Sequence, residues 1–434
     1  MTTKCRSVYP RSQRKEAVEV VAHNRPKPRK IEQKAVFPIV LALGTVIGVP
    51  VTGARAQMPS GLTCQKVPPE GHVTSNPIAC TVSCAKGGKL ASALALAPRT
   101  TAGLTITING TCVEAVDQVP GNVTLQGASS GDGLQAPDAS SNPVLGIGGA
   151  GVTLDNLTIF GGVNALLVRS GGTATGNNLE IEGSSSQNVL AQGVLSLNSS
   201  TIEQSSGDGI DVLSGGRVFL NGGTVRNNAR GINIGGGYLR ADAGAVISDN
   251  AGIGVETNGS LTVLAATIEG NSNFGVLVIN GGIAFIASPG VVKSNGRDGV
   301  QVFGGSARVF GGVISNNARF GISVFSSGTA ILDAGAVVAS NASNGVLVED
   351  GTVTVGDGDG GATIQSNPAN GIYLKTNSVG VFNNDGNQIV SNSGWGILCD
   401  GPPANPLIAI GLAASKIGTV SGNGAGQISC NLAP

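Results

Sequence analysis

Short runs of alternating apolar and polar residues recur along most of the chain, and one series of these runs follows a repeated glycine. Examples are "GISVF" at residues 321–325 and "GVLVE" at residues 345–349, in which Ile or Val occupies every second position. A period of two is typical of a β-strand with one buried face. The period of an amphipathic helix is absent from these runs. The pattern therefore predicts many short strands.

The glycines that precede these runs mark a repeat. Successive glycines lie 21 to 26 residues apart, and the series consists of Gly209, Gly231, Gly254, Gly275, Gly299, Gly321, Gly345, Gly371 and Gly396. Each repeat holds a second run such as "ARVFGG" and a third such as "GVIS". Propeller blades and helical repeats are longer, and the leucine-rich repeat frame is missing. Three strands and three turns in about 23 residues predict one coil of a parallel β-solenoid.

A polar residue stands four positions before each of these glycines. It is Ser205 in the first coil, and in the other coils it is Asn227, Asn250, Asn271, Asn295, Asn317, Asn341, Asn367 and Asn392. In a solenoid, equivalent positions form a column, and stacked Asn side chains can pass amide hydrogen bonds from coil to coil. Asn also tolerates the left-handed backbone of a sharp turn. We expect these residues to form a structural Asn ladder.

With these repeats the chain resembles the right-handed parallel β-helix proteins of the pectin lyase-like superfamily. The segment "GGKLASALALA" resembles the short helix that caps one end of the core. "LTITINGTC", "NVTLQG" and "VTLDNLTIFGG" resemble the first strands. The resemblance implies an all-β, right-handed parallel β-helix with coils of roughly 22–25 residues. It does not decide the function, because this fold includes lyases, hydrolases, epimerases, adhesins and inert surface proteins.

The N-terminal segment differs from the repeats. Residues 1–34 are basic and polar, and an apolar stretch then precedes Ala54-Arg55-Ala56. This order is typical of a Sec-type signal peptide at 1–56, and an uncleaved anchor is the alternative. We expect a disulfide-containing N-terminal cap at 57–88, the β-helix at 89–400 and a C-terminal cap at 401–434, with no membrane span after cleavage.

The charge changes when the leader is removed. Residues 57–434 hold 15 Lys and Arg and 23 Asp and Glu, a net charge of −8. No basic cluster remains to follow a phosphate backbone, so nucleic acid is not an expected partner.

Six cysteines lie outside the leader and cluster towards the two ends of the chain. They are Cys64, Cys80, Cys84, Cys112, Cys399 and Cys430. An even number in an exported chain predicts disulfides. Zinc is the alternative, but no Cys-x-x-Cys occurs and His72 is the only histidine after the leader. We expect Cys399 to pair with Cys430, while the four N-terminal cysteines allow three connectivities.

The candidate catalytic residues lie on the outward side of three successive coils. They are Asp208, Asp211, Arg230 and Glu256. The spacing of stacked strands places Asp211 and Glu256 roughly 9–10 Å apart, close to the carboxylate separation of inverting glycosidases. The alternative is a set of solvated ion pairs.

A local motif at this place resembles one of a known enzyme family. "SGDGIDV" is similar to a polygalacturonase motif, with Asp208 at the place of a catalytic carboxylate. The chain has "NARGINI" where that family needs an Asp pair, and it lacks the required His, so a polygalacturonase is excluded. Lyases of this fold use Arg or Lys as the base and acidic residues for Ca²⁺, which Arg230 and its acidic neighbours could imitate.

The candidate carbohydrate-binding residues are aromatic. Phe303, Phe325, Tyr373 and Trp395 could stack on the apolar faces of sugars, or they could fill turn corners and lie beneath the C-terminal segment. "GDGDGG" at 356–361 has alternating Asp residues, but no Glu completes an EF-hand and the segment occurs once. We therefore predict no metal site and no cofactor, with Ca²⁺ as the one cofactor left open.

Two classes of function remain. The first is an exported, non-catalytic β-helix protein, expected as a monomer, that presents an extended surface to a polysaccharide or cell-surface glycan. Its location would be secreted, periplasmic or at the cell surface. The alternative is a polysaccharide lyase, hydrolase or epimerase with an acidic site on the first polar coils. Scarce ionisable clusters and the near absence of His favour the non-catalytic interpretation.

Overall fold

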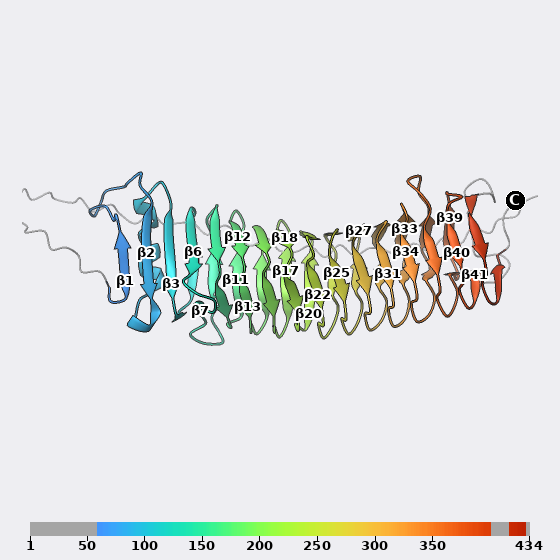
Figure 1. The fold of residues 1–434 in the computed structure, drawn as a ribbon, viewed down its shortest axis with the longest axis horizontal. Helices are drawn as coiled ribbons and strands as arrows, with labels where there is room; N and C mark the ends of the chain where they lie inside the picture. Colours follow the sequence, from blue (N-terminus) through green and yellow to red (C-terminus); the bar gives the residue numbers. More distant parts are fainter. Residues whose placement is uncertain (1–58, 401–415, 431–434) are drawn as a thin grey trace, which may run out of the picture. The chain divides into compact units, whose positions relative to one another are not determined.

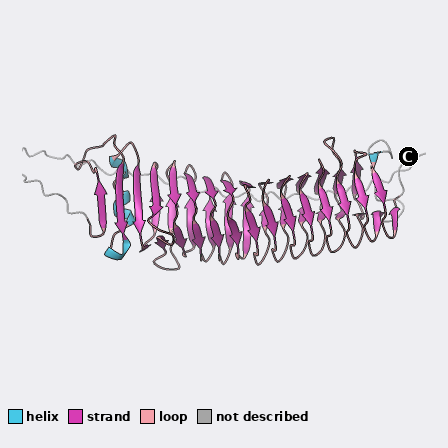
Figure 2. Cartoon of the chain, viewed as in Figure 1, coloured by secondary structure: helices cyan, strands magenta, loops and turns pink. Residues whose placement is uncertain are grey.

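Three long sheets wind around a common core, and each coil of the chain contributes one strand to each sheet (Figure 1). A computed structural model describes residues 59–400 and 416–430, so the expected signal peptide and part of the expected C-terminal cap lie outside the described residues. Sheet 1 has 15 strands, and sheets 2 and 3 have 14 each. Strands and short turns make up nearly all of the described chain (Figure 2). The prediction of an all-β parallel solenoid is confirmed.

Between β3 and β41 the strands of each sheet follow one another at every third position in the chain order, and the first and last strands depart from this rule. Sheet 1 comprises β1 (Leu62–Gln65), β2 (Ile78–Ser83), β3 (Leu104–Asn109), β6 (Val123–Gly127), β9 (Val152–Asp155), β12 (Thr173–Asn177), β15 (Val194–Asn198), β18 (Arg217–Asn221), β21 (Tyr238–Asp242), β24 (Ser260–Val263), β27 (Ile283–Ala287), β30 (Ser306–Phe310), β33 (Thr329–Asp333), β36 (Thr352–Val355) and β39 (Val379–Phe382). Sheet 2 comprises β4 (Thr111–Val113), β7 (Gly133–Gln135), β10 (Thr158–Phe160), β13 (Glu180–Glu182), β16 (Thr201–Glu203), β19 (Thr224–Arg226), β22 (Val246–Ser248), β25 (Thr267–Glu269), β28 (Val291–Lys293), β31 (Val313–Ser315), β34 (Val337–Ala339), β37 (Thr363–Gln365), β40 (Gln388–Val390) and β42 (Thr419–Ser421). Sheet 3 comprises β5 (Val116–Val119), β8 (Leu145–Ile147), β11 (Asn164–Val168), β14 (Gln187–Ala191), β17 (Asp208–Leu213), β20 (Arg230–Gly235), β23 (Val255–Thr257), β26 (Val276–Ile279), β29 (Val300–Phe303), β32 (Ile322–Phe325), β35 (Val346–Glu349), β38 (Ile372–Leu374), β41 (Trp395–Cys399) and β43 (Gly426–Ile428). All neighbouring strands pair in parallel except β1 and β2.

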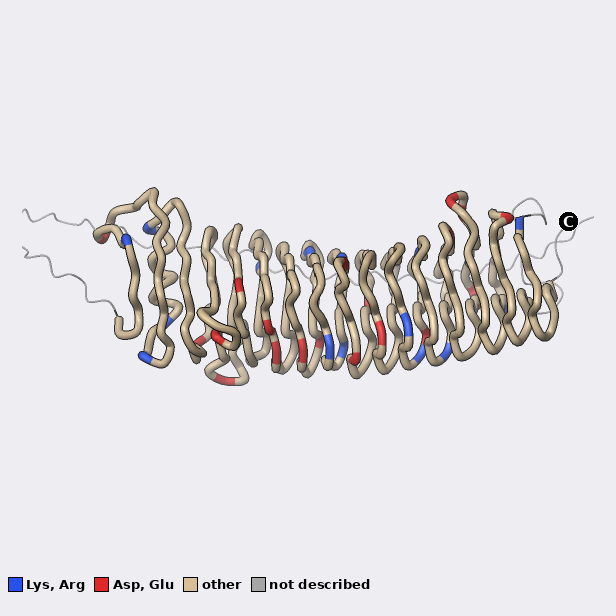
Figure 3. The backbone as a smooth tube through the Cα atoms, viewed as in Figure 1, with Lys and Arg blue, Asp and Glu red and all other residues tan. Residues whose placement is uncertain are grey.

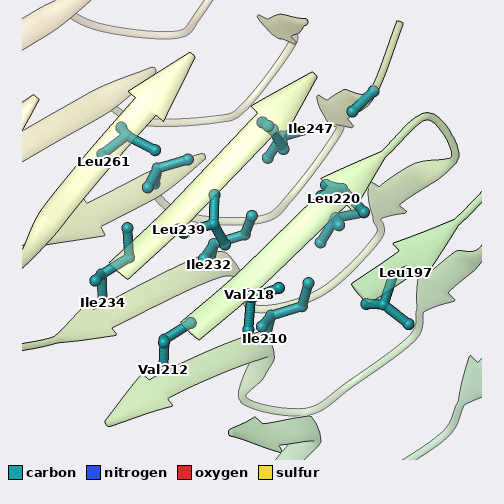
Figure 4. Packing of buried hydrophobic residues seen from close by; sticks show 14 of the residues in the cluster. Leu197, Ile210, Val212, Val218, Leu220, Ile232, Ile234, Leu239, Ile247 and Leu261 are labelled. Atoms are coloured by element: carbon teal, nitrogen blue, oxygen red, sulfur yellow. The ribbon is translucent and has the colours of Figure 1, made fainter. Parts of the chain in front are cut away.

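The core is a stack of aliphatic side chains inside the coils. Val218 and Leu220 of β18 are fully buried, whereas Phe219 between them points outward and is only partly buried. Figure 4 shows these residues packed between the strands with Ile232 and Ile234 of β20. Strand pairing keeps equivalent positions in register, as Ile210 opposite Ile232 illustrates. The alternating pattern of the sequence therefore fixes which side chains face the core and which form outer columns.

One short helix covers the N-terminal end of the core. α1 (Leu90–Leu94) buries Leu90, Ala93 and Leu94, and two short 3-10 helices, η1 (Cys84–Lys86) and η2 (Ala97–Arg99), flank it. Glu114 accepts hydrogen bonds from the N–H groups of Leu90 and Ala91 at 2.7 and 3.4 Å, which satisfies donors that the helix start leaves free. None of the helices in the described ranges is long and apolar enough to cross a membrane.

Three disulfides staple the two ends of the solenoid. Cys64 pairs with Cys80 between β1 and β2, and Cys84 pairs with Cys112 between η1 and β4. Cys399 of β41 pairs with Cys430, as expected from the sequence. Cys64 lies on β1, the first strand of sheet 1, and Cys112 lies on β4, the first strand of sheet 2, while Cys430 follows β43, the last strand of sheet 3. The bonds therefore fasten the two ends of the stack, where coils have fewer neighbours.

A buried ladder of Asn side chains follows the turn between sheets 2 and 3. Its members are Asn228, Asn250, Asn271, Asn295, Asn317, Asn341, Asn367, Asn392 and Asn423. Each of the first eight donates from its side-chain amide to the Oδ1 of the next, as Asn250 does to Asn271 at 2.8 Å. Its backbone N–H donates to the same oxygen, at 3.2 Å for this pair. The ladder thus links ten successive coils once the N–H of Ser205, which donates to Asn228, is included.

One predicted member of the ladder was wrong. Asn227 is exposed, and its neighbour Asn228 occupies the column. Asn227 has a positive φ of 55°, as do the residues directly before other ladder members, for example Asn316 and Ser340. The left-handed residue and the ladder residue are therefore adjacent but distinct. Counting back from Gly231 failed because this coil has one residue fewer between its ladder Asn and its glycine.

The repeated glycine is required by close packing against this ladder. A Cβ on Gly254 would lie 2.7 Å from the amide nitrogen of Asn271 and 2.6 Å from the carbonyl oxygen of Gly275. The same neighbours, taken from the next coil, surround Gly321. These glycines are absent from the residues with positive φ, so it is space and not backbone conformation that excludes a side chain.

Candidate functional site

A polar cluster lies on the outer face of sheet 3, where the four candidate catalytic residues meet. Arg230 donates two hydrogen bonds to Asp208, from Nε to Oδ1 at 2.7 Å and from Nη2 to Oδ2 at 2.9 Å. Its Nη1 donates to Oε2 of Glu256 at 2.8 Å. Asp211 accepts a bond from Asn233 at 2.8 Å. The column of Asp211, Asn233 and Glu256 on successive strands is the one expected from the repeat.

Burial and charge set the protonation of the cluster. Asp211 is 8% exposed, and loss of water raises the pKa of its carboxyl; the bond from Asn233 opposes the shift, and the charge of Asp208 adds to it. Burial alone would lower the pKa of Arg230, but the bonds and charges of Asp208 and Glu256 raise it overall. Arg230 therefore stays charged, and Asp208 and Glu256 serve as its counter-ions.

This arrangement limits the chemistry available to the cluster. A guanidinium whose pKa is raised cannot act as a general base, so the base role considered for Arg230 has no support here. Two hollows, of about 350 and 430 Å³, lie near the N-terminal end and contain none of the four residues. Burial raises the carboxyl pKa of Asp211, as a general acid needs.

The four aromatic candidates do not form one strip. Phe303 and Phe325 occupy equivalent positions on β29 and β32, and Phe303 is 50% exposed. Tyr373 lies in a different column and donates a hydrogen bond to Asp400 at 2.6 Å. Burial and this bond raise the pKa of the Tyr373 phenol to about 12.

Trp395 lies beneath the C-terminal segment. A Cβ on Gly426 would lie 2.4 Å from its ring, so the indole packs directly on the backbone of β43. This is the alternative role considered for the aromatic residues. Of the four candidates, only Phe303 and Phe325 remain as neighbouring rings in one column, the first exposed and the second partly exposed.

Acidic side chains approach one another at two other places. Oxygens of Glu180, Glu182 and Glu203 lie within 4.8 Å of one another on sheet 2, and burial together with the charges of its two neighbours raises the pKa of Glu182. Glu203 is already bound to Arg226 at 2.7 Å. In the "GDGDGG" loop, Asp359 lies 3.5 Å from Arg308. Both places have an arginine that competes with a cation for the carboxylates.

Sequence reasoning missed a row of aromatic and arginine side chains on the outer face of sheet 1. Phe219, Arg240, Thr262, Phe285 and Arg308 occupy one column on β18, β21, β24, β27 and β30. The strands of sheet 1 begin six to eight residues after the repeat glycine, so alignment on that glycine leaves this column out of register. Alignment on each strand's own alternation would have found it.

A second, shorter amide ladder, which sequence reasoning also did not predict, lies at the C-terminal ends of strands in sheet 1. Asn221 donates to Asn198 at 2.9 Å, Asn198 donates to Asn177 at 2.7 Å, and Asn177 donates to Asp155. Four successive strands are joined in this way. The signal was present, because Asn recurs at the last position of β12, β15 and β18.

The three parallel sheets, the coil length and the ladder define the protein as a right-handed parallel β-helix, the class to which pectin lyase-like proteins belong. Residues 143–310 match the family described as "Right handed beta helix region". No curated protein sequence matches the chain significantly.

Solved structures with a similar backbone come from proteins of several kinds. The A-module of the Azotobacter vinelandii mannuronan C-5 epimerase AlgE6 shares 17% identity, with 78% of this chain and 93% of that one covered and a TM-score of 0.43. The Dettilon tailspike protein shares 12% identity, with 78% and 64% covered and a TM-score of 0.47. PfbA, a surface adhesin of Streptococcus pneumoniae, shares 12% identity, with 71% and 86% covered and a TM-score of 0.28. None of these likenesses specifies a function for this chain.

Proposed function

We propose that this chain is an exported, non-catalytic, monomeric β-helix protein that presents its outer faces to a polysaccharide or cell-surface glycan. The observation that carries the proposal is the ring pair Phe303–Phe325 on successive strands, in which Phe303 is half exposed and Phe325 is partly exposed. Parallel strands stack about 4.8 Å apart, a distance comparable with the length of one sugar unit, and exposed rings pack well on apolar sugar faces.

Two further observations support this function. The ion pairs of Arg230 with Asp208 and Glu256 neutralise most of the cluster that could have been catalytic. Three disulfides fit a protein that works in an oxidising, extracellular setting. Charged positions are sparse along the coils (Figure 3), so most side chains of the outer columns are neutral.

The test is retention of the purified protein by immobilised polysaccharides. We expect at least one polysaccharide to retain the wild type and Phe303→Ala to weaken retention. Val113→Ala, which removes an exposed apolar side chain elsewhere, serves as the control and should bind as the wild type does. Failure of every polysaccharide to retain the wild type would refute a glycan-binding role.

A polysaccharide-active enzyme is the second candidate, and the raised pKa of Asp211 favours it. Asp211, whose carboxyl pKa burial raises, and the neighbouring Asp208 would supply two carboxyl groups on one face. The test follows both new reducing ends and unsaturated products, with and without Ca²⁺. Turnover that Asp211→Asn abolishes would support the enzyme and overturn the non-catalytic proposal.

A further inference from the structure

The outer face of sheet 1 between β18 and β33 carries aromatic side chains that do not pack in the core. Phe219 and Tyr238 pack edge to face with ring centres 6.0 Å apart, and Phe285 and Phe310 lie 6.2 Å apart. The four rings are partly exposed, and Ile283 beside them is 54% exposed. The interior of these coils is filled by other residues, such as Leu239 and Ile286. The outward rings are therefore not needed to fill the core, and exposed apolar groups of this kind mark a binding surface.

Guanidinium groups lie between these rings. Arg217 lies over the Tyr238 ring at 5.7 Å, and Arg308 lies over the Phe310 ring at 5.4 Å. Arg240 donates from Nε and Nη2 to Asp242, and Arg308 donates from Nε and Nη2 to Asp333. The carboxylates hold both guanidinium planes, and in the described part of the chain each Nη1 remains without a hydrogen bond to protein. Fixed, unoccupied donors of this kind suit ligand hydroxyl groups.

The charges of this face decide between a neutral and an anionic ligand. Arg217, Arg240 and Arg308 are its cations, and they stand against four carboxylates, those of Asp242, Asp333, Asp357 and Asp359. The face thus has no excess positive charge. A polyanion would gain little from such a surface and would meet the exposed Asp359. Neutral hydroxyl-bearing ligands match the mixture of rings, donors and acceptors.

The direction of the ligand follows from the column. Phe219, Arg240, Thr262, Phe285 and Arg308 lie on five neighbouring strands, each directly paired with the next. A chain molecule that crosses the strands meets one of these side chains about every 4.8 Å. Rings three strands apart could then stack on sugars three units apart, with an arginine and a threonine in between.

We propose that the outer face of sheet 1 from β18 to β33 binds a neutral polysaccharide whose chain crosses the strands along the Phe219–Arg308 column. The proposal rests on the proposed function only in taking a glycan as ligand, because it assigns a surface separate from the Phe303–Phe325 pair. Phe219 and Phe285 stack on apolar sugar faces, Arg240 and Arg308 donate to hydroxyl groups, and Asp242 accepts from them.

The experiment is affinity electrophoresis of the full-length protein in gels that contain a soluble neutral polysaccharide, namely galactomannan, xyloglucan, mixed-linkage β-glucan or dextran. Alginate and polygalacturonate serve as anionic probes. The test variant is Phe219→Ala/Phe285→Ala, and Arg240→Gln is a second variant that removes no ring. Phe160→Ala is the matched control, because Phe160 is 41% exposed on sheet 2, away from this column. Circular dichroism checks that every variant folds.

We expect one neutral polysaccharide to retard the wild type, with little effect of salt. The double variant should weaken its binding at least tenfold, Arg240→Gln should weaken it several-fold, and Phe160→Ala should leave it unchanged. Unchanged binding by a folded double variant, or binding of the anionic probes alone, would overturn the proposal. If Phe303→Ala lost binding while the double variant bound as the wild type does, the binding role of sheet 1 would be refuted and the proposed function would stand. No binding to any polysaccharide would refute both.

Discussion

Truncation of a ladder asparagine should lower the free energy of unfolding, because its side chain makes several buried hydrogen bonds. Each one accepts two hydrogen bonds and donates others inside a buried column, so truncation leaves partners on two coils unsatisfied. An unpaired buried polar group costs about 1–3 kcal/mol. Position in the column and not residue type decides this cost, because Asn227 and Asn228 are chemically identical neighbours.

We expect Asn228→Ala to lower the free energy of unfolding by about 1–3 kcal/mol, the cost of the hydrogen bonds that it loses. Asn227→Gly, at an exposed residue with positive φ, should change it by less than about 0.5 kcal/mol, because glycine adopts that conformation freely. Urea unfolding followed by circular dichroism measures both variants. Equal effects of the two substitutions would show that the ladder runs elsewhere.

Asp211 gives the protein a dependence on pH that can be measured. Because burial raises its pKa in the folded state, the folded protein binds this proton more tightly than the unfolded chain does. The stabilising contribution is complete at pH values below the carboxyl pKa of the unfolded chain. It is lost as the pH rises through the folded-state pKa.

Asp211→Asn keeps an acceptor for Asn233 and cannot ionise. We therefore expect it to raise the melting temperature at neutral pH, and the difference from the wild type should shrink as the pH falls below the ordinary carboxyl range. Thermal melts over a series of pH values follow this difference. A constant difference across the series would mean that Asp211 does not titrate with a raised pKa.

At the scale of strands and turns, the sequence predicts sheet 3 much better than sheet 1. The run after each repeat glycine has a fixed register, so the sequence predicts the column of Asp211, Asn233 and Glu256. The turn into sheet 1 varies in length, so alignment on the repeat glycine does not bring the residues of the Phe219 column into register. The hydrogen-bond geometry that neutralises Arg230 depends on side-chain conformations that no spacing reveals.

The terminal disulfide is an element whose effect should be local. In a solenoid each coil contacts only its neighbours, so the last coils are stabilised from one side. The double variant Cys399→Ser/Cys430→Ser removes a bond with a sequence separation of 31 residues. Such bonds commonly contribute about 2–4 kcal/mol.

We expect amide hydrogen exchange in this variant to speed up in β41 and β43 and to remain unchanged in β17 and β20. Exchange measured by mass spectrometry resolves these segments. Faster exchange along the whole solenoid would show that the stack unfolds as one cooperative unit, and the local account of the disulfide would then be wrong.

At the scale of the whole molecule, the fold follows from a simple repeat while the function depends on its irregularities. Ile and Val columns, the ladder and the packed glycines account for the stack, and spacing alone predicts them apart from the exchange of Asn227 for Asn228. The residues that face solvent differ from coil to coil, so each outer column has to be examined in three dimensions. The proposed glycan-binding role rests on those outer columns.

The measurement that tests the central claim most directly is a combined retention and turnover assay on one panel of polysaccharides. We predict that the wild type is retained by at least one of them and releases no reducing ends or unsaturated products, with or without Ca²⁺. Turnover that disappears in Asp211→Asn, while the variant remains folded, would contradict the account and place an active site on the first polar coils.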